Sequence, residues 1–169
     1  LVAGMLFIHR KYADQARELL VREDAVIEGP HREQRIVVPV NGINRAVIQA
    51  VNFARTMGSD IRAVYVTEDH EAAEALRVRW ARQIPGVPLV IVESPYRAVI
   101  SPVIAYLDVL DQAWPPDKEV PITIVVLPEY VARHWWERLL YNSTARRLRT
   151  AIIGREHTVV ADVPYRRKH

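Results

Sequence analysis

The chain has 169 residues, half of them hydrophobic, which is enough for one domain whose core needs no disulfide or metal to hold it together. It contains no cysteine, so disulfides, thiolate catalysis and cysteine zinc sites are excluded, and its six histidines are scattered with no pair at ligand spacing, so no metal site is expected. The net charge of +3 comes from local clusters rather than a continuous basic stripe, and we expect no nucleic-acid partner.

Residues 1–30 are predicted to form a juxtamembrane segment and linker ahead of a globular domain at 31–169. The apolar residues 1–8 are followed at once by the basic residues 9–11, a pattern typical of a transmembrane helix that ends on the cytoplasmic side. The run is too short to span a bilayer, and its charges follow the apolar residues, which excludes a secretory signal. The alternative is an amphipathic helix packed on this domain or on a second copy.

Five apolar segments rich in β-branched residues predict strands that alternate with helices. The expected strands are residues 36–40, 61–66, 89–92, 120–127 and 158–163, and the expected helices are 44–57, 70–83, a segment around 99–110, and 142–153. This alternation indicates an α/β fold, a doubly wound parallel sheet of the flavodoxin-like or a related type. The first and fourth strands are the most apolar and are placed at the centre, which gives the order 3-2-1-4-5.

The crevice between the first and fourth strands is where such a sheet binds ligands. Asn41 and Gly42 end the first strand, and Asn44 has the position of an N-cap before the following helix. Arg45 falls in the first turn of that helix, where a cation opposes the helix dipole unless an anion is bound. These four residues are therefore a candidate phosphate site.

Two other turns carry candidate ligand groups. Ser94, Tyr96 and Arg97 combine a hydroxyl, an aromatic plane and a guanidinium, which suit a base and a phosphate; the alternative is a plain strand-to-helix turn with Tyr96 packed on the core. The segment Asn142-Ser143-Thr144 stands at a helix N-terminus, with two arginines in the next turn. It is predicted to cap the helix, either alone or while also contacting a phosphate.

No catalytic motif is present: the sequence has no G-x-S-x-G, no Walker A motif and no Gly-rich dinucleotide fingerprint. We therefore expect a binding domain and not an enzyme, with no cofactor. The adjacent Trp135 and Trp136 point about 100° apart on a helix, so one of them is expected to meet a partner subunit, the first helix or a ligand base.

Residues 36–66 resemble the opening strand, helix and second strand of the universal stress protein fold, and LLYNSTARRL (139–148) resembles its phosphate-binding turn and following helix. ATP-binding members have Gly-x-x-Gly, nine residues, then Gly-Ser or Gly-Thr. Here the glycine positions fall on Glu129, Ala132 and Asn142, and only Ser143 matches. This departure argues against ordinary ATP binding in that loop.

A narrower resemblance covers nearly the whole chain. It rests on VPVNGINRAV (38–47), ESPYRAVISPVIAYLD (93–108), LPEYVARHWWERLLYNSTA (127–145) and VVADVPY (159–165). These motifs resemble the carboxy-terminal cytoplasmic domain of KUP-type, KimA-like proton-coupled potassium importers of the amino acid–polyamine–organocation superfamily. The resemblance implies a universal-stress-protein-like domain at the cytoplasmic face of the cell membrane, joined to a transmembrane domain of the same chain.

The same resemblance implies a homodimer that binds cyclic di-AMP as a regulatory ligand and thereby inhibits potassium import. A nearly two-fold symmetric dinucleotide would suit a symmetric dimer that offers each arginine and tyrosine twice. Two alternatives stay open: a domain that binds ATP or AMP, and a ligand-free dimerisation module of a permease. The transported substrate, potassium or an amino acid, also stays open.

Overall fold

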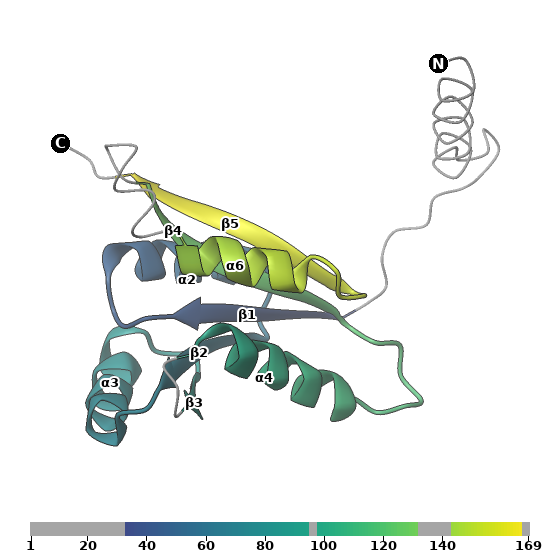
Figure 1. Ribbon diagram of the computed structural model, residues 1–169, viewed down its shortest axis with the longest axis horizontal. Coiled ribbons are helices and arrows are strands. Elements are labelled where there is room, and N and C mark those ends of the chain that lie inside the picture. Colours follow the sequence, from purple (N-terminus) through teal and green to yellow (C-terminus); the bar gives the residue numbers. More distant parts are fainter. Residues whose placement is uncertain (1–32, 95–97, 132–142, 167–169) are drawn as a thin grey trace, which may run out of the picture. The chain divides into compact units, whose positions relative to one another are not determined.

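The computed structural model describes residues 33–94, 98–131 and 143–166. They form one parallel sheet in the order β3-β2-β1-β4-β5, which confirms the predicted α/β class and strand order (Figure 1). The strands are β1 (Gln34–Val40), β2 (Ile61–Thr67), β3 (Leu89–Glu93), β4 (Ile122–Val131) and β5 (Thr158–Arg166). The helices are α2 (Arg45–Met57), α3 (His70–Gln83), α4 (Ile100–Gln112) and α6 (Ser143–Ile152). The juxtamembrane helix expected within residues 1–30 lies outside the described residues.

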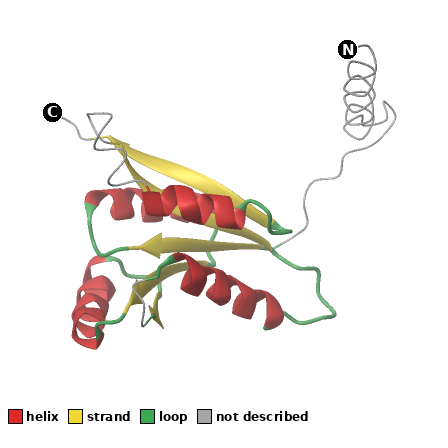
Figure 2. Ribbon diagram, viewed as in Figure 1, coloured by secondary structure: helices red, strands yellow, loops and turns green. Residues whose placement is uncertain are grey.

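Helices cover both faces of the sheet, because each crossover between parallel strands returns over one face or the other. Val47 of α2 and Trp80 of α3 share one hydrophobic core with Ile36 of β1. Leu107 of α4 and residues of α6 share a second core with Val37, the next residue along β1. Neighbouring residues of β1 thus face opposite cores, which explains why this strand is apolar at consecutive positions. The alternation of strands and helices can be followed in Figure 2.

β4 and β5 are longer than the sequence indicates, and each continues through a proline. They pair with each other along Thr123–Val131 and Thr158–Arg166, so the neighbouring strand holds the extended backbone. The carbonyl of His157 accepts from the backbone N–H of Thr123, so the backbone N–H and C=O groups of residue 157 point toward β4. Since backbone groups alternate sides along a strand, Pro164 faces away from β4 and removes no ladder bond.

Among the helices that the structure describes, none combines the length and the apolar character needed to cross a membrane.

Candidate functional site

The two central strands part at their carboxyl ends. β1 pairs with β2 from Ile36 to Val40, but it pairs with β4 only from Gln34 to Val37. Beyond Val37 the side of β1 that faces β4 has no partner in the ladder. This opens the sheet at the topological switch point, where doubly wound folds bind their ligands.

Two prolines explain why the ladder stops there. The N–H of Ile36 donates toward β2, so Pro39, three residues on, faces β4. The N–H of Ile122 donates to Glu33 at the start of β1, so Pro128, six residues on, faces β1. Continuing this register, each proline occupies a position whose N–H would donate across the gap, and proline has no N–H. The gap is therefore built into the sequence of both strands.

A cavity of about 970 Å³ lies at this opening. Its walls are mainly apolar and come from both faces of the sheet. Val40 and Val47 belong to the core shared with α2 and α3, and Val64, Leu127 and Leu148 belong to the core shared with α4 and α6. Its polar lining groups are Asn41, Asn44, Arg45, Thr144 and the two tyrosines Tyr65 and Tyr165. Apolar walls with a few convergent polar groups are typical of small-molecule sites, and the volume suits a nucleotide.

Asn44 caps α2, as predicted. Its Oδ1 accepts from the backbone N–H of Val47 at 3.0 Å, and its Nδ2 donates to Oδ1 of Asn41 at 2.9 Å. The cap thereby fixes the side chain of Asn41 beside the helix start. Gly42 lies between them with φ of +136°, a value that favours glycine. The turn after β1 is held in one conformation at the edge of the cavity.

Arg45 is the first residue of α2, and its side chain is exposed at the cavity. Within the described part of the chain it makes no ion pair or hydrogen bond, and the first turn of α2 has no acidic residue. A cation here lies against the positive end of the helix dipole, which is unfavourable by itself. An anion bound in the cavity would satisfy both positive groups.

The structure brings four of the ten predicted site residues together: Asn41, Asn44, Arg45 and Thr144 all line the cavity. Gly42 shapes their turn but is not among the described lining residues. Ser94 is 4% exposed and donates from its hydroxyl to the carbonyl of Ala98 at 2.9 Å, so it holds its own turn and does not line the cavity.

The remaining predicted site residues lie wholly or partly outside the described part of the chain. Tyr96, Arg97 and Asn142 lie outside the described residues, as do Trp135 and Trp136. For Ser143 only the backbone is described, at the start of α6.

Sequence reasoning missed several lining residues, among them two tyrosines and Pro39. Tyr65 and Tyr165 come from β2 and β5, which are separated in the sheet by β1 and β4. Pro39 and Pro128 also line the cavity, and they carry a signal that could have been used. A proline within an otherwise apolar central strand removes a ladder bond and so indicates a place where the sheet opens.

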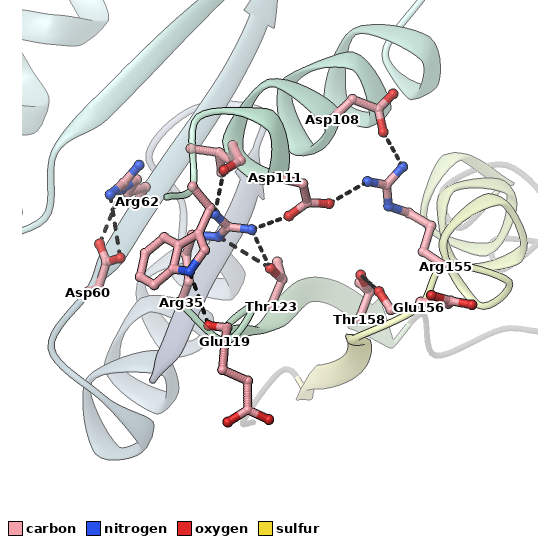
Figure 3. A network of polar contacts seen from close by, with 12 residues as sticks. Arg35, Asp60, Arg62, Asp108, Asp111, Glu119, Thr123, Arg155, Glu156 and Thr158 are labelled. Carbon is pink, nitrogen blue, oxygen red and sulfur yellow. Dashed lines mark hydrogen bonds and ion pairs between the residues drawn. The ribbon is translucent and has the colours of Figure 1, made fainter. Parts of the chain in front are cut away.

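A second polar cluster occupies the opposite, amino-terminal edge of the sheet (Figure 3). Arg35, at the start of β1, is only 2% exposed. Its guanidinium donates to the hydroxyl of Thr123 at 2.8 Å, to the carbonyl of Leu110 at 3.0 Å and to the carboxylate of Asp111. A buried guanidinium with this many acceptors joins β1, β4 and the end of α4 as a structural unit.

Arg155, in the turn before β5, extends this cluster. It donates to Asp108 at 2.5 Å and to Asp111 at 2.9 Å, so Asp111 bridges two arginines (Figure 3). Burial by itself would lower the pKa of Arg155, but the hydrogen bonds and charges of Asp108 and Asp111 outweigh it and raise the pKa above its ordinary value. Both arginines have acidic partners, which distinguishes this cluster from Arg45.

No described group of three or more histidine and acidic residues could hold a metal ion. The polar side chains that line the cavity carry amides, hydroxyls and a guanidinium. These can donate hydrogen bonds to an anion and can orient a polar ligand.

The chain is similar to known proteins over most of its described part. The potassium transporter KimA of Bacillus subtilis (strain 168) is 28% identical over 130 residues, which are 77% of this chain. Those residues are 21% of that transporter, so the chain spans about a fifth of the length of this curated relative. Residues 31–165 match the family model of the KimA potassium transporter C-terminal domain. Because this match covers well over half of the chain, the chain belongs to the family of KimA potassium transporter C-terminal domains.

Proposed function

We propose that this chain is the cytoplasmic regulatory domain of a membrane transporter, a potassium importer or an amino acid permease. In this proposal the domain dimerises and binds cyclic di-AMP, and the bound nucleotide inhibits transport. The observation that carries the ligand site is Arg45, a cation at a cavity with apolar walls that has no partner among residues 33–94, 98–131 and 143–166. Family membership and the sequence resemblance support the transporter context.

The cavity lining includes groups that suit each part of a nucleotide. A phosphate would accept hydrogen bonds from Arg45, from Thr144 and from the free N–H groups at the start of α2. An adenine would find apolar walls such as Val66 and Val99, or the ring of Tyr65. A cation together with apolar and aromatic walls in one cavity favours a nucleotide over a simple inorganic anion.

The dimer follows from the symmetry of the ligand. Cyclic di-AMP is close to two-fold symmetric, so two identical chains can each supply one phosphate site and one surface for an adenine. The nucleotide can inhibit transport only to the extent that it binds one arrangement of the paired domains more tightly than another. Regulation in this proposal therefore requires dimerisation.

Calorimetric titration of the 169-residue chain with cyclic di-AMP tests the proposal, with ATP and cyclic di-GMP as controls. We expect selective binding of cyclic di-AMP at one nucleotide per two chains, and sedimentation should show a dimer. Binding of ATP but not of cyclic di-AMP would instead indicate an ordinary nucleotide-binding stress-type domain. No heat of binding with any of the three ligands would indicate a ligand-free dimerisation module.

The substitution Arg45→Ala tests the position of the site. Loss of a charge-assisted hydrogen bond to a phosphate should weaken cyclic di-AMP binding roughly 10- to 100-fold. Arg79→Ala is the matched control, because Arg79 is also an exposed helical arginine but lies on α3 and does not line the cavity. Equal affinities of the two variants would refute the assignment.

Transport by the full-length protein tests the regulatory step. Uptake measured across a range of cyclic di-AMP concentrations should be inhibited in the unmodified protein and in the Arg79→Ala variant. The Arg45→Ala variant should need a correspondingly higher concentration of nucleotide. Inhibition that is identical in all three proteins would place the regulatory site elsewhere.

A further inference from the structure

The cavity has an unusual balance of charge. Arg45 is the only residue with a formal charge among the described residues that line it, and no aspartate or glutamate is found among them. Proteins that hold magnesium nucleotides do so with one or two carboxylates together with the phosphates of the ligand. The described lining of this cavity supplies donors for a phosphate but no carboxylate for a divalent cation.

Asn41 lies in the turn between β1 and α2, shortly before Arg45, and its amide lines the same cavity. Its Oδ1 accepts the hydrogen bond from Nδ2 of Asn44, whose own Oδ1 is used by the backbone N–H of Val47. The orientation of the Asn41 amide is therefore set by the cap, and its Nδ2 makes no hydrogen bond among the described residues. Asn41 adds neutral N–H donors to the same cavity as the guanidinium of Arg45.

We infer that the cavity selects a phosphodiester nucleotide bound without a divalent cation, and that Asn41 is a specificity-determining residue for this choice. The inference rests on the proposed function, and it adds that the nucleotide binds without a divalent cation. A phosphodiester carries a single negative charge, which one arginine can balance. A nucleoside triphosphate carries several charges and binds as its magnesium complex, for which the described lining has no carboxylate.

The first test is to titrate the 169-residue chain with cyclic di-AMP in the presence of EDTA and, separately, in the presence of magnesium chloride. The inference predicts the same affinity in both buffers. Binding that is lost in EDTA would overturn the inference while leaving the proposed function intact. If cyclic di-AMP binds in neither buffer, the proposed function itself is overturned, so the two failures are distinguishable.

The second test is Asn41→Asp, which has nearly the same shape and still accepts the hydrogen bond from Asn44. It places a negative charge beside the phosphate, so cyclic di-AMP affinity in EDTA should fall at least about tenfold. Magnesium should recover part of that loss and should increase binding of ATP, since the new carboxylate can hold the cation. Unchanged affinity for cyclic di-AMP would overturn the role of Asn41.

Asn52→Asp is the matched control. Asn52 is an exposed residue of α2 outside the described cavity lining, and its Oδ1 accepts from Arg55 at 3.3 Å, so the substitution keeps that bond as well. It adds the same charge within α2, away from the cavity, and should leave both affinities unchanged. Thermal melting of both variants verifies the fold. A loss of affinity in Asn52→Asp as large as in Asn41→Asp would show a general charge effect and overturn the inference.

Discussion

The two edges of the sheet use arginine in opposite ways. At the amino-terminal edge, Arg35 is buried, and Asp111 links it to Arg155 across three segments of the chain. At the carboxyl edge, Arg45 is exposed at a cavity with no partner in the described part of the chain. In the first arrangement carboxylates of the protein balance both guanidinium charges, and in the second no described carboxylate does, so charge alone does not identify a site. A structural arginine has an acidic partner within the protein, whereas a ligand-binding arginine is expected to lack one until the ligand binds.

Breaking the paired edge should have the largest effect. Asp111→Ala leaves the buried guanidinium of Arg35 without its carboxylate, and losing one partner of a buried ion pair costs about 3 kcal/mol or more. Because Asp111 is itself 36% exposed and Arg35 keeps its bonds to Thr123 and Leu110, we expect a smaller loss, about 2 kcal/mol. Thermal melting should show a decrease of roughly 6 °C in Tm.

The control for this variant is Asp117→Ala, which removes an exposed carboxylate from the loop after α4 and should melt like the unmodified chain. The comparison is sharpened by titrating Asp111→Ala with cyclic di-AMP below its melting temperature. Affinity should be unchanged, because the cluster lies at the edge opposite the cavity. Equal melting temperatures for the two aspartate variants would contradict a structural role for the cluster.

Closing the open edge should have an intermediate effect. Replacing both Pro39 and Pro128 with valine restores one N–H donor on each side of the gap, each directed toward a carbonyl of the other strand, and the β1–β4 ladder can then extend. Each new hydrogen bond stabilises the fold by about 1 kcal/mol. Removing a proline also raises the conformational entropy of the unfolded chain, which offsets this gain, so Tm should change little. Cyclic di-AMP affinity should fall about tenfold as the cavity narrows.

Pro164→Val provides the control for the two strand prolines. Pro164 also lies within a strand, but its missing N–H faces away from β4, and its carbonyl accepts from Gln49 instead. This variant should bind cyclic di-AMP like the unmodified chain. If the double variant also binds normally, the parting of β1 and β4 does not determine the site.

The smallest effect is expected from the cap. Asn44→Ala removes the hydrogen bond to the N–H of Val47 and should reduce the free energy of unfolding by about 1 kcal/mol. Chemical denaturation measures this loss, with Asn52→Ala as the control on the exposed face of the same helix. Since Asn44 also holds Asn41, cyclic di-AMP affinity should fall in the first variant only. The same unfolding free energy in both variants would contradict the capping role.

Much of the fold and part of the site follow from local sequence. Consecutive β-branched residues in β1 required burial on both faces, and that requirement placed the strand at the centre of the sheet. Asn44 followed by an apolar helical repeat was sufficient to predict the cap, because the capping bond joins residues only three positions apart. Asn41 and Arg45 could be assigned to the switch point without coordinates, because the predicted strand order places the end of the first strand there.

Other features depend on residues that are distant in sequence. Tyr65 and Tyr165 meet in one cavity because the sheet places β2 and β5 on either side of the central pair, and neither tyrosine has a local pattern that predicts this. Ser94 had a plausible ligand chemistry, yet its hydroxyl bonds to Ala98 within its own turn.

The cavity combines features that could be predicted from the sequence with one that depends on the tertiary structure. The sequence by itself determined the strands, their order and the helix cap, since these follow from apolar periodicity and from bonds between near neighbours. Only the tertiary structure decided that Pro39 and Pro128 both face the gap between β1 and β4, because the side to which a backbone group points depends on the register between two strands. Pro39 and Pro128 both leave out an N–H group where β1 and β4 part, and this opens the cavity. In a different register the two prolines would not come together at this gap.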